Sequence, residues 1–221
     1  MKPERFDALT DGMFAIIMTL LVIEIRVPEL HSAVTNEKLF EGLLELWPLF
    51  ISYLLAFMVL FSYWMAHNFI VNLFAKNLTR KFLYINMPFL ATVALIPFSS
   101  HFLGLYNDFQ AGVVVFGVNI AVGAIFLWKI LKHAIHSPEI ENDLERFTQK
   151  DMHYAQIRIL LPAFGALVAI PVSYIDPTIS IFIFVGITVF NFIPGTLITA
   201  DRMIGRFLSK AGLKEAETEV E

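Results

Sequence analysis

Residues 109–131 read FQAGVVVFGVNIAVGAIFLWKIL, and Lys129 carries the only charge in this stretch. A transmembrane helix needs about 20 consecutive, mostly apolar residues to cross the hydrocarbon core of a bilayer. The stretch meets that length and therefore predicts a membrane-spanning helix. Its small residues Gly112, Gly117 and Gly123 favour close contact with neighbouring helices.

Five other stretches share this length and character, at residues 6–25, 43–69, 82–105, 155–175 and 178–200. Of the 221 residues, 57% are hydrophobic and 16% are charged, whereas a soluble domain is usually about half apolar and a quarter charged. The sequence therefore predicts an all-α integral membrane protein with six transmembrane helices per chain. We expect one transmembrane domain at residues 1–205 and a cytoplasmic C-terminal tail at residues 206–221.

The distribution of basic residues predicts the orientation of the chain in the membrane. Fourteen of the 16 Lys and Arg residues lie on one side of the predicted bundle. They are at the N-terminus, between the second and third helices, between the fourth and fifth helices, after the sixth helix, or at the adjoining helix ends. Arg26 and Lys38 are the two that fall on the other side. Because cytoplasmic loops are enriched in Lys and Arg, both termini are expected in the cytoplasm.

Several classes of function lack their sequence signatures. The chain has no Cys, which excludes disulfides and thiolate metal sites, and its net charge of −4 gives no basic footprint for nucleic acid. It contains no His-Glu-x-x-His zinc motif, no Gly-x-Ser-x-Gly elbow and no Thr-Val-Gly-Tyr-Gly filter. We therefore expect no enzymatic activity, no bound metal and no cofactor.

The first predicted helix carries a narrow stripe of Gly12, Ile16, Thr19 and Ile23, spaced so that the four residues share one face. If several copies of the chain placed this face around an axis, the residues would stack as rings of Ile, Thr and Ile. Such a lining makes a hydrophobic constriction that can close by dewetting. Spacing alone does not distinguish this arrangement from ordinary helix packing.

Charged side chains gather at the start of the same helix. Asp7 and Asp11 lie four residues apart, so their like charges share a face and favour a neutralising partner. Ionisable groups near the membrane usually face a bundle interior or a water-filled path. We expect Arg5 and Asp11 each to pair with another helix or subunit. His67, at the same membrane depth, either joins this network or only hydrogen-bonds a backbone carbonyl.

These motifs resemble the transmembrane-protein-175 family of potassium channels. The family signature, Arg-x-x-x-Phe-Ser-Asp before an apolar helix with a Thr, is matched by residues 5–11, with Leu9 and Thr10 in place of Phe and Ser. The Trp64-x-x-His67 pair at the end of the second helix is also similar to the family. The six-helix layout extends the resemblance over essentially the whole chain.

The resemblance implies a cation channel that prefers potassium and needs no cofactor besides the permeant ion. A chain without an internal repeat is expected to form a homotetramer in a prokaryotic plasma membrane, with self, lipid and potassium as partners. The expected pore-lining residues are Ile16, which would form the inner constriction, Thr19, Leu20 and Ile23. The residues expected to form a structural network around the first helix are Arg5, Thr10, Asp11, Trp64 and His67.

Two other classes of function stay open at this point. A cation-coupled secondary transporter is the main alternative, because prolines such as Pro97 allow the broken helices typical of transporters. An intramembrane enzyme or a scaffold comes third, since no nucleophile–base pair stands out.

Overall fold

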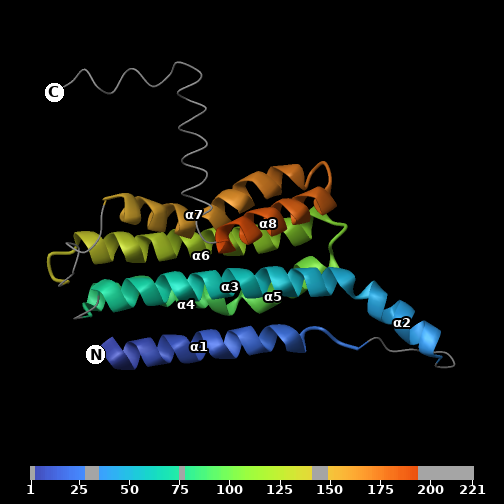
Figure 1. Ribbon diagram of the computed structural model, residues 1–221, viewed down its shortest axis with the longest axis horizontal. Helices are drawn as coiled ribbons and strands as arrows, with labels where there is room; N and C mark the ends of the chain where they lie inside the picture. The colour runs from blue at the N-terminus through green and yellow to red at the C-terminus, as the bar shows by residue number, and fades with distance from the viewer. Residues whose placement is uncertain (1–2, 28–34, 75–77, 141–148, 194–221) are drawn as a thin grey trace, which may run out of the picture.

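The computed structural model describes residues 3–27, 35–74, 78–140 and 149–193. It shows a bundle of roughly antiparallel helices, in which α5 continues the direction of α4 (Figure 1). The helices are α1 (Pro3–Ile23), α2 (Asn36–Glu45), α3 (Trp47–Phe74), α4 (Arg80–Ala94), α5 (Ile96–Leu105), α6 (Gln110–His136), α7 (Gln149–Val172) and α8 (Pro177–Phe192). We refer to the end of the bundle where α1 begins as the Pro3 end and to the opposite end as the Glu24 end.

The bundle has a centre and two flanks. Helices α3, α4, α5 and α6 contact one another in the centre, α7 and α8 cover α6 on one flank, and α1 lies against α3, α4 and α5 on the other (Figure 1). The first helix is therefore at the edge of the chain, and only one of its faces meets the rest of the bundle.

Five helical segments are long and apolar enough to cross a membrane, which confirms the prediction of an all-helical membrane protein. They are Glu4–Ile23, Trp47–Val71, Arg80–Leu105, Gln110–His136 and Met152–Val172. A shorter apolar helix, α8, has 16 residues and ends next to the last described residue. The predicted sixth span continues to residue 200, and its end, like the predicted tail at 206–221, lies outside the described residues.

The second predicted span begins too early. The structure separates residues 43–45, at the end of α2, from α3, which starts at Trp47. Figure 1 shows α2 leaving the end of the bundle at an angle to α3. Pro48 lies in the first turn of α3, where its missing N–H costs no helical hydrogen bond, so it favours a new helix start at this point.

The third span contains a discontinuity at Leu95. Helix α4 ends at Ala94 and α5 begins at Ile96, with Pro97 in the first turn of α5. Pro97 has no N–H to donate to the preceding turn, so the hydrogen-bond ladder is interrupted while the chain keeps its direction. This interruption confirms that the proline loosens the span.

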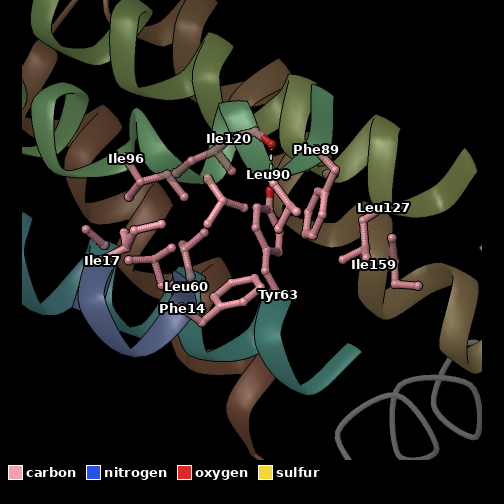
Figure 2. Packing of buried hydrophobic residues seen from close by; sticks show 14 of the residues in the cluster. Phe14, Ile17, Leu60, Tyr63, Phe89, Leu90, Ile96, Ile120, Leu127 and Ile159 are labelled. Atoms are coloured by element: carbon pink, nitrogen blue, oxygen red, sulfur yellow. Dashed lines mark hydrogen bonds between the residues drawn. The ribbon is translucent and has the colours of Figure 1, made fainter. Parts of the chain in front are cut away.

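Aromatic side chains pack among branched aliphatic ones in the core (Figure 2). The Tyr63 hydroxyl on α3 donates a hydrogen bond of 2.6 Å to the carbonyl of Ile120 on α6. A Cβ atom at Gly123 would lie 2.9 Å from the Tyr63 ring, so the glycine makes room for the ring. The predicted close approach of the glycine-rich helix is thereby confirmed at this position.

Candidate functional site

The first helix has a buried face that attaches it to the bundle. Phe6, Thr10, Phe14, Ile17 and Leu21 are each at most 6% exposed, and their spacing of three or four residues puts them on one side of α1. This face meets α3, α4 and α5. The helix is therefore held by a continuous row of large side chains along most of its length.

The opposite face of α1 carries all the predicted pore-lining residues, and the chain leaves them uncovered. Ile16 is 61%, Leu20 44% and Ile23 66% exposed, and Thr19 is exposed as well. The Thr19 hydroxyl donates a hydrogen bond of 2.8 Å to the carbonyl of Ile16 on its own helix. A single chain thus presents an apolar stripe with one hydroxyl oxygen in its middle.

A hydrogen bond between side chains connects α1 to α3 near the Pro3 end. The Trp64 indole N–H donates to Oδ1 of Asp11 over 2.8 Å, and both residues are half-buried. The Thr10 hydroxyl donates instead to the carbonyl of Phe6, 3.0 Å away on its own helix. Arg5 is exposed. Of the predicted network, the structure brings Asp11 and Trp64 together directly.

His67 lies behind this contact in an aromatic pocket. It is 1% exposed, and its ring stacks on Phe89 with centroids 5.5 Å apart and planes 6° apart. Phe6 and Phe14 of α1 also contact the ring, at 6.1 and 6.4 Å between centroids. His67 is therefore part of the surface on which α1 rests.

The polar partner of His67 is Asn86 on α4. The distance from Nε2 of His67 to Oδ1 of Asn86 is 2.7 Å, and the Asn86 amide N–H donates over 2.8 Å to the carbonyl of Phe82. Because the amide oxygen accepts, Nε2 carries the proton. No motif in the sequence assigned Asn86 to the network; its only signal was that of a polar residue within a mostly apolar helix.

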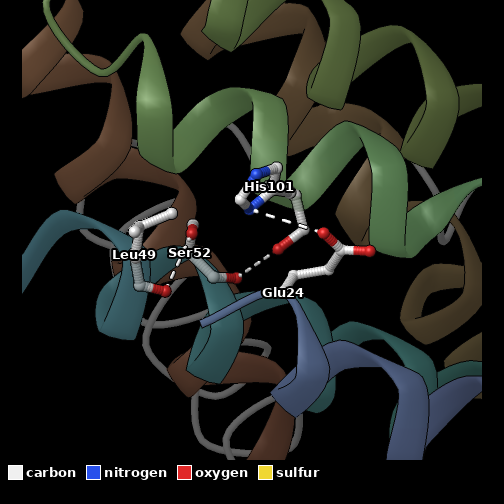
Figure 3. A network of polar contacts seen from close by, with 5 residues as sticks. Glu24, Leu49, Ser52 and His101 are labelled. Atoms are coloured by element: carbon white, nitrogen blue, oxygen red, sulfur yellow. Dashed lines mark hydrogen bonds and ion pairs between the residues drawn. The ribbon is translucent and has the colours of Figure 1, made fainter. Parts of the chain in front are cut away.

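A second polar contact connects α1 to the bundle at the Glu24 end (Figure 3). Oε2 of Glu24 lies 3.8 Å from Nδ1 of His101 on α5. Next to it, the Ser100 hydroxyl donates over 2.9 Å to the carbonyl of Ser52 on α3. These contacts therefore lie where the end of α1 meets the second turn of α3 and the middle of α5, and the sequence pattern did not single them out.

Carboxylates and imidazoles are not gathered into a metal site in the part of the chain that the structure describes. Within residues 3–27, 35–74, 78–140 and 149–193, no group of three or more His, Asp or Glu side chains is arranged to hold an ion. Asp11 joins α1 to α3 through its hydrogen bond with Trp64, whereas the hydroxyls of Thr10 and Thr19 bond carbonyls of α1 itself.

Comparison with known proteins identifies relatives of this architecture. The model of the family described as endosomal/lysosomal potassium channel TMEM175 matches residues 5–97. A potassium channel of Chamaesiphon minutus is 36% identical over 131 residues, which are 57% of this chain and 64% of that protein, slightly under two thirds of its length. A potassium channel of a Chryseobacterium species is 26% identical over 82% of this chain and 88% of its own length.

A solved structure extends the similarity over most of the bundle. The crystal structure of a lysosomal potassium-selective channel TMEM175 homolog from Chamaesiphon minutus has a TM-score of 0.72 and 26% sequence identity, covering 86% of this chain and 95% of that one. The relatives are ion channels, in agreement with the expectation of neither enzymatic activity nor a cofactor. In motif, fold and relatives, the chain is similar to the TMEM175 family.

Proposed function

We propose that the protein is a potassium-selective channel of a prokaryotic plasma membrane, built from four copies of the chain with α1 of each copy lining the pore. Each copy would cross the membrane six times within residues 1–205, with both termini and the tail at 206–221 in the cytoplasm. The names of the relatives support the choice of ion. The uncovered stripe of α1 supports the choice of helix.

The observation that carries the proposal is the division of α1 into two faces. One face is built into the bundle, and the other exposes Ile16, Leu20 and Ile23 at the edge of the chain. In a tetramer with α1 at the axis, this face would form rings of Ile, Thr, Leu and Ile. Rings of branched apolar side chains exclude water from a narrow passage and so form a hydrophobic constriction.

The geometry of Thr19 suits a cation in such a passage. Its hydroxyl hydrogen points to the carbonyl of Ile16, and a hydroxyl has one donor and two acceptor lone pairs. The remaining lone pairs are free to accept, so four copies would offer a ring of oxygens to a partly dehydrated cation. Carboxylates on the same helix, Asp11 at one end and Glu24 at the other, would favour cations over anions.

The network residues Arg5, Thr10, Asp11, Trp64 and His67 would act as positioning residues in this channel. The Asp11–Trp64 hydrogen bond and the ring of His67 fix the start of α1 against α3. A constriction made of side chains requires a helix that keeps its distance from the axis, because small shifts change the width of the passage.

Ion flux into liposomes that contain only this protein tests the proposal. We expect rapid potassium flux down a gradient, slower sodium flux, and no requirement for a second solute. Replacement of Ile16 with Asn should wet the constriction and raise potassium flux severalfold. The matched control is Ile125→Asn, which makes the same change at a 42% exposed position on α6 and should leave the flux unchanged.

A secondary transporter is the alternative, favoured by the interruption of the third span at Leu95, since transporters use broken helices near the middle of the membrane. Flux that appears only when a second solute moves would establish the transporter and reject the channel. Proton flux without potassium flux, measured with a pH-sensitive dye in the same liposomes, would reject the assignment of potassium.

A further inference from the structure

A cavity of about 90 Å³ lies between the last turns of α6 and the first turns of α7. Its lining consists of Trp128, Leu131, Lys132 and His136 from α6 and Gln156 from α7. Trp128, Lys132 and His136 follow one another at intervals of four residues, so they form one row along the helix. The cavity thus combines an apolar wall with a cation, an imidazole and an amide.

The polar groups of this row have neighbours that hold them in place. Nζ of Lys132 lies 4.9 Å from the centre of the Trp128 ring, a cation–π contact. In the described part of the chain, Lys132 forms no ion pair with a carboxylate. Nδ1 of His136 is 2.9 Å from the carbonyl of Lys132. Since the carbonyl accepts, Nδ1 carries a proton, and Nε2 is the nitrogen that can meet a ligand.

The length of α6 indicates the depth of this cavity in a membrane. Its 27 residues span about 40 Å at 1.5 Å per residue, whereas the hydrocarbon core is about 30 Å thick. The last two turns, with Lys132 and His136, therefore reach the headgroup layer. Trp128 lies just before them, at the level where tryptophan is enriched in membrane proteins.

We propose that this cavity binds the phosphate group of an anionic phospholipid. Lys132 supplies a positive charge that no carboxylate of the described residues pairs with, and Gln156 can donate a hydrogen bond to a phosphate oxygen. His136 adds a second donor when its ring is protonated. The apolar wall of Trp128 and Leu131 fits the glycerol and first acyl carbons better than it fits a free ion. Basic pockets between transmembrane helices are typical sites for such headgroups.

The test measures lipid binding to the purified full-length protein in a neutral detergent. Dioleoyl phosphatidylglycerol, dioleoyl phosphatidylcholine and inorganic phosphate are titrated separately, and the thermal unfolding midpoint and the lipid adducts in native mass spectra are recorded. We expect saturable binding of phosphatidylglycerol and much weaker binding of the other two. Lys132→Gln should weaken phosphatidylglycerol binding about fivefold, the effect of one basic residue near an anionic headgroup.

Lys129→Gln is the matched control, because it removes the same charge from the same helix at a side chain that lies over Phe126, 5.1 Å from its ring centre, and outside the cavity lining. It should change the binding less than twofold. Gln156→Leu provides a second lining variant in case Lys132→Gln does not fold, and it should also weaken binding.

Equal binding of phosphatidylglycerol by the wild type and both lining variants would overturn the proposal. Inorganic phosphate binding as tightly as the lipid would overturn the assignment to a lipid. Neither readout depends on ion flux, so failure here is distinct from failure of the proposed channel function.

Discussion

Replacing Trp64 with Phe tests whether the start of α1 is held by its hydrogen bond to α3. The substitution removes the indole N–H that lies 2.8 Å from Oδ1 of Asp11 and keeps an aromatic ring beside Phe61. A hydrogen bond to a charged group contributes roughly 1.5–3 kcal/mol. Both residues are half-buried, and water can partly replace the lost donor, so we expect a loss of about 1–2 kcal/mol.

A double-mutant cycle separates this hydrogen bond from lost packing. Unfolding free energies are measured in detergent for Trp64→Phe, Asp11→Ala and the double variant. The coupling energy should be about 1–2 kcal/mol, since each single change already removes the bond. Asp11→Asn keeps an acceptor oxygen and should retain part of the stability. A coupling energy below about 0.3 kcal/mol, the range of independent sites, would refute the reasoning.

Two further substitutions test helix contacts in the core by denaturation in detergent. Tyr63→Phe removes the 2.6 Å hydrogen bond to the carbonyl of Ile120 and should cost about 1 kcal/mol; no loss would mean that the carbonyl is satisfied without it. Gly104→Ala would place a methyl group 2.6 Å from Oγ of Ser52 and should cost about 1–3 kcal/mol by overpacking. Its control is Gly186→Ala, where nothing lies within 4 Å and stability should be unchanged or higher; equal effects of the two alanines would contradict the close contact.

The membrane spans were predictable because length and hydropathy determine them almost independently of tertiary structure. The start of α3 was not predictable from hydropathy. Leu43 and Leu44 continue the apolar run, but they belong to the separate short helix α2. Hydropathy does not distinguish the apolar side of a short amphipathic helix from the beginning of a span. Pro48 was the local signal that favoured a new helix start.

Which side chains of the site contact one another was less predictable than which residues belong to the site. Sequence placed Asp11, Trp64 and His67 at a similar depth, and the structure pairs the first two. The partner of His67 is Asn86, because the rotation of α3 about its axis turns the ring toward α4. Helix rotation depends on the packing of several helices at once, so no motif in a single segment reports it.

The two polar contacts of α1 explain why its uncovered face can be uniform. The Asp11–Trp64 hydrogen bond connects α1 to α3 near one end, and Glu24 lies 3.8 Å from Nδ1 of His101 at the other end; 13 residues, about 20 Å, separate Asp11 from Glu24. Between these points the buried row of apolar side chains attaches α1 to the bundle, and the hydroxyl of Thr19 bonds within the helix. The residues that fix the position of α1 in the bundle are therefore different from those on its uncovered face. In the proposed channel, the uncovered face could therefore line the passage, because the packing of the single chain does not depend on it.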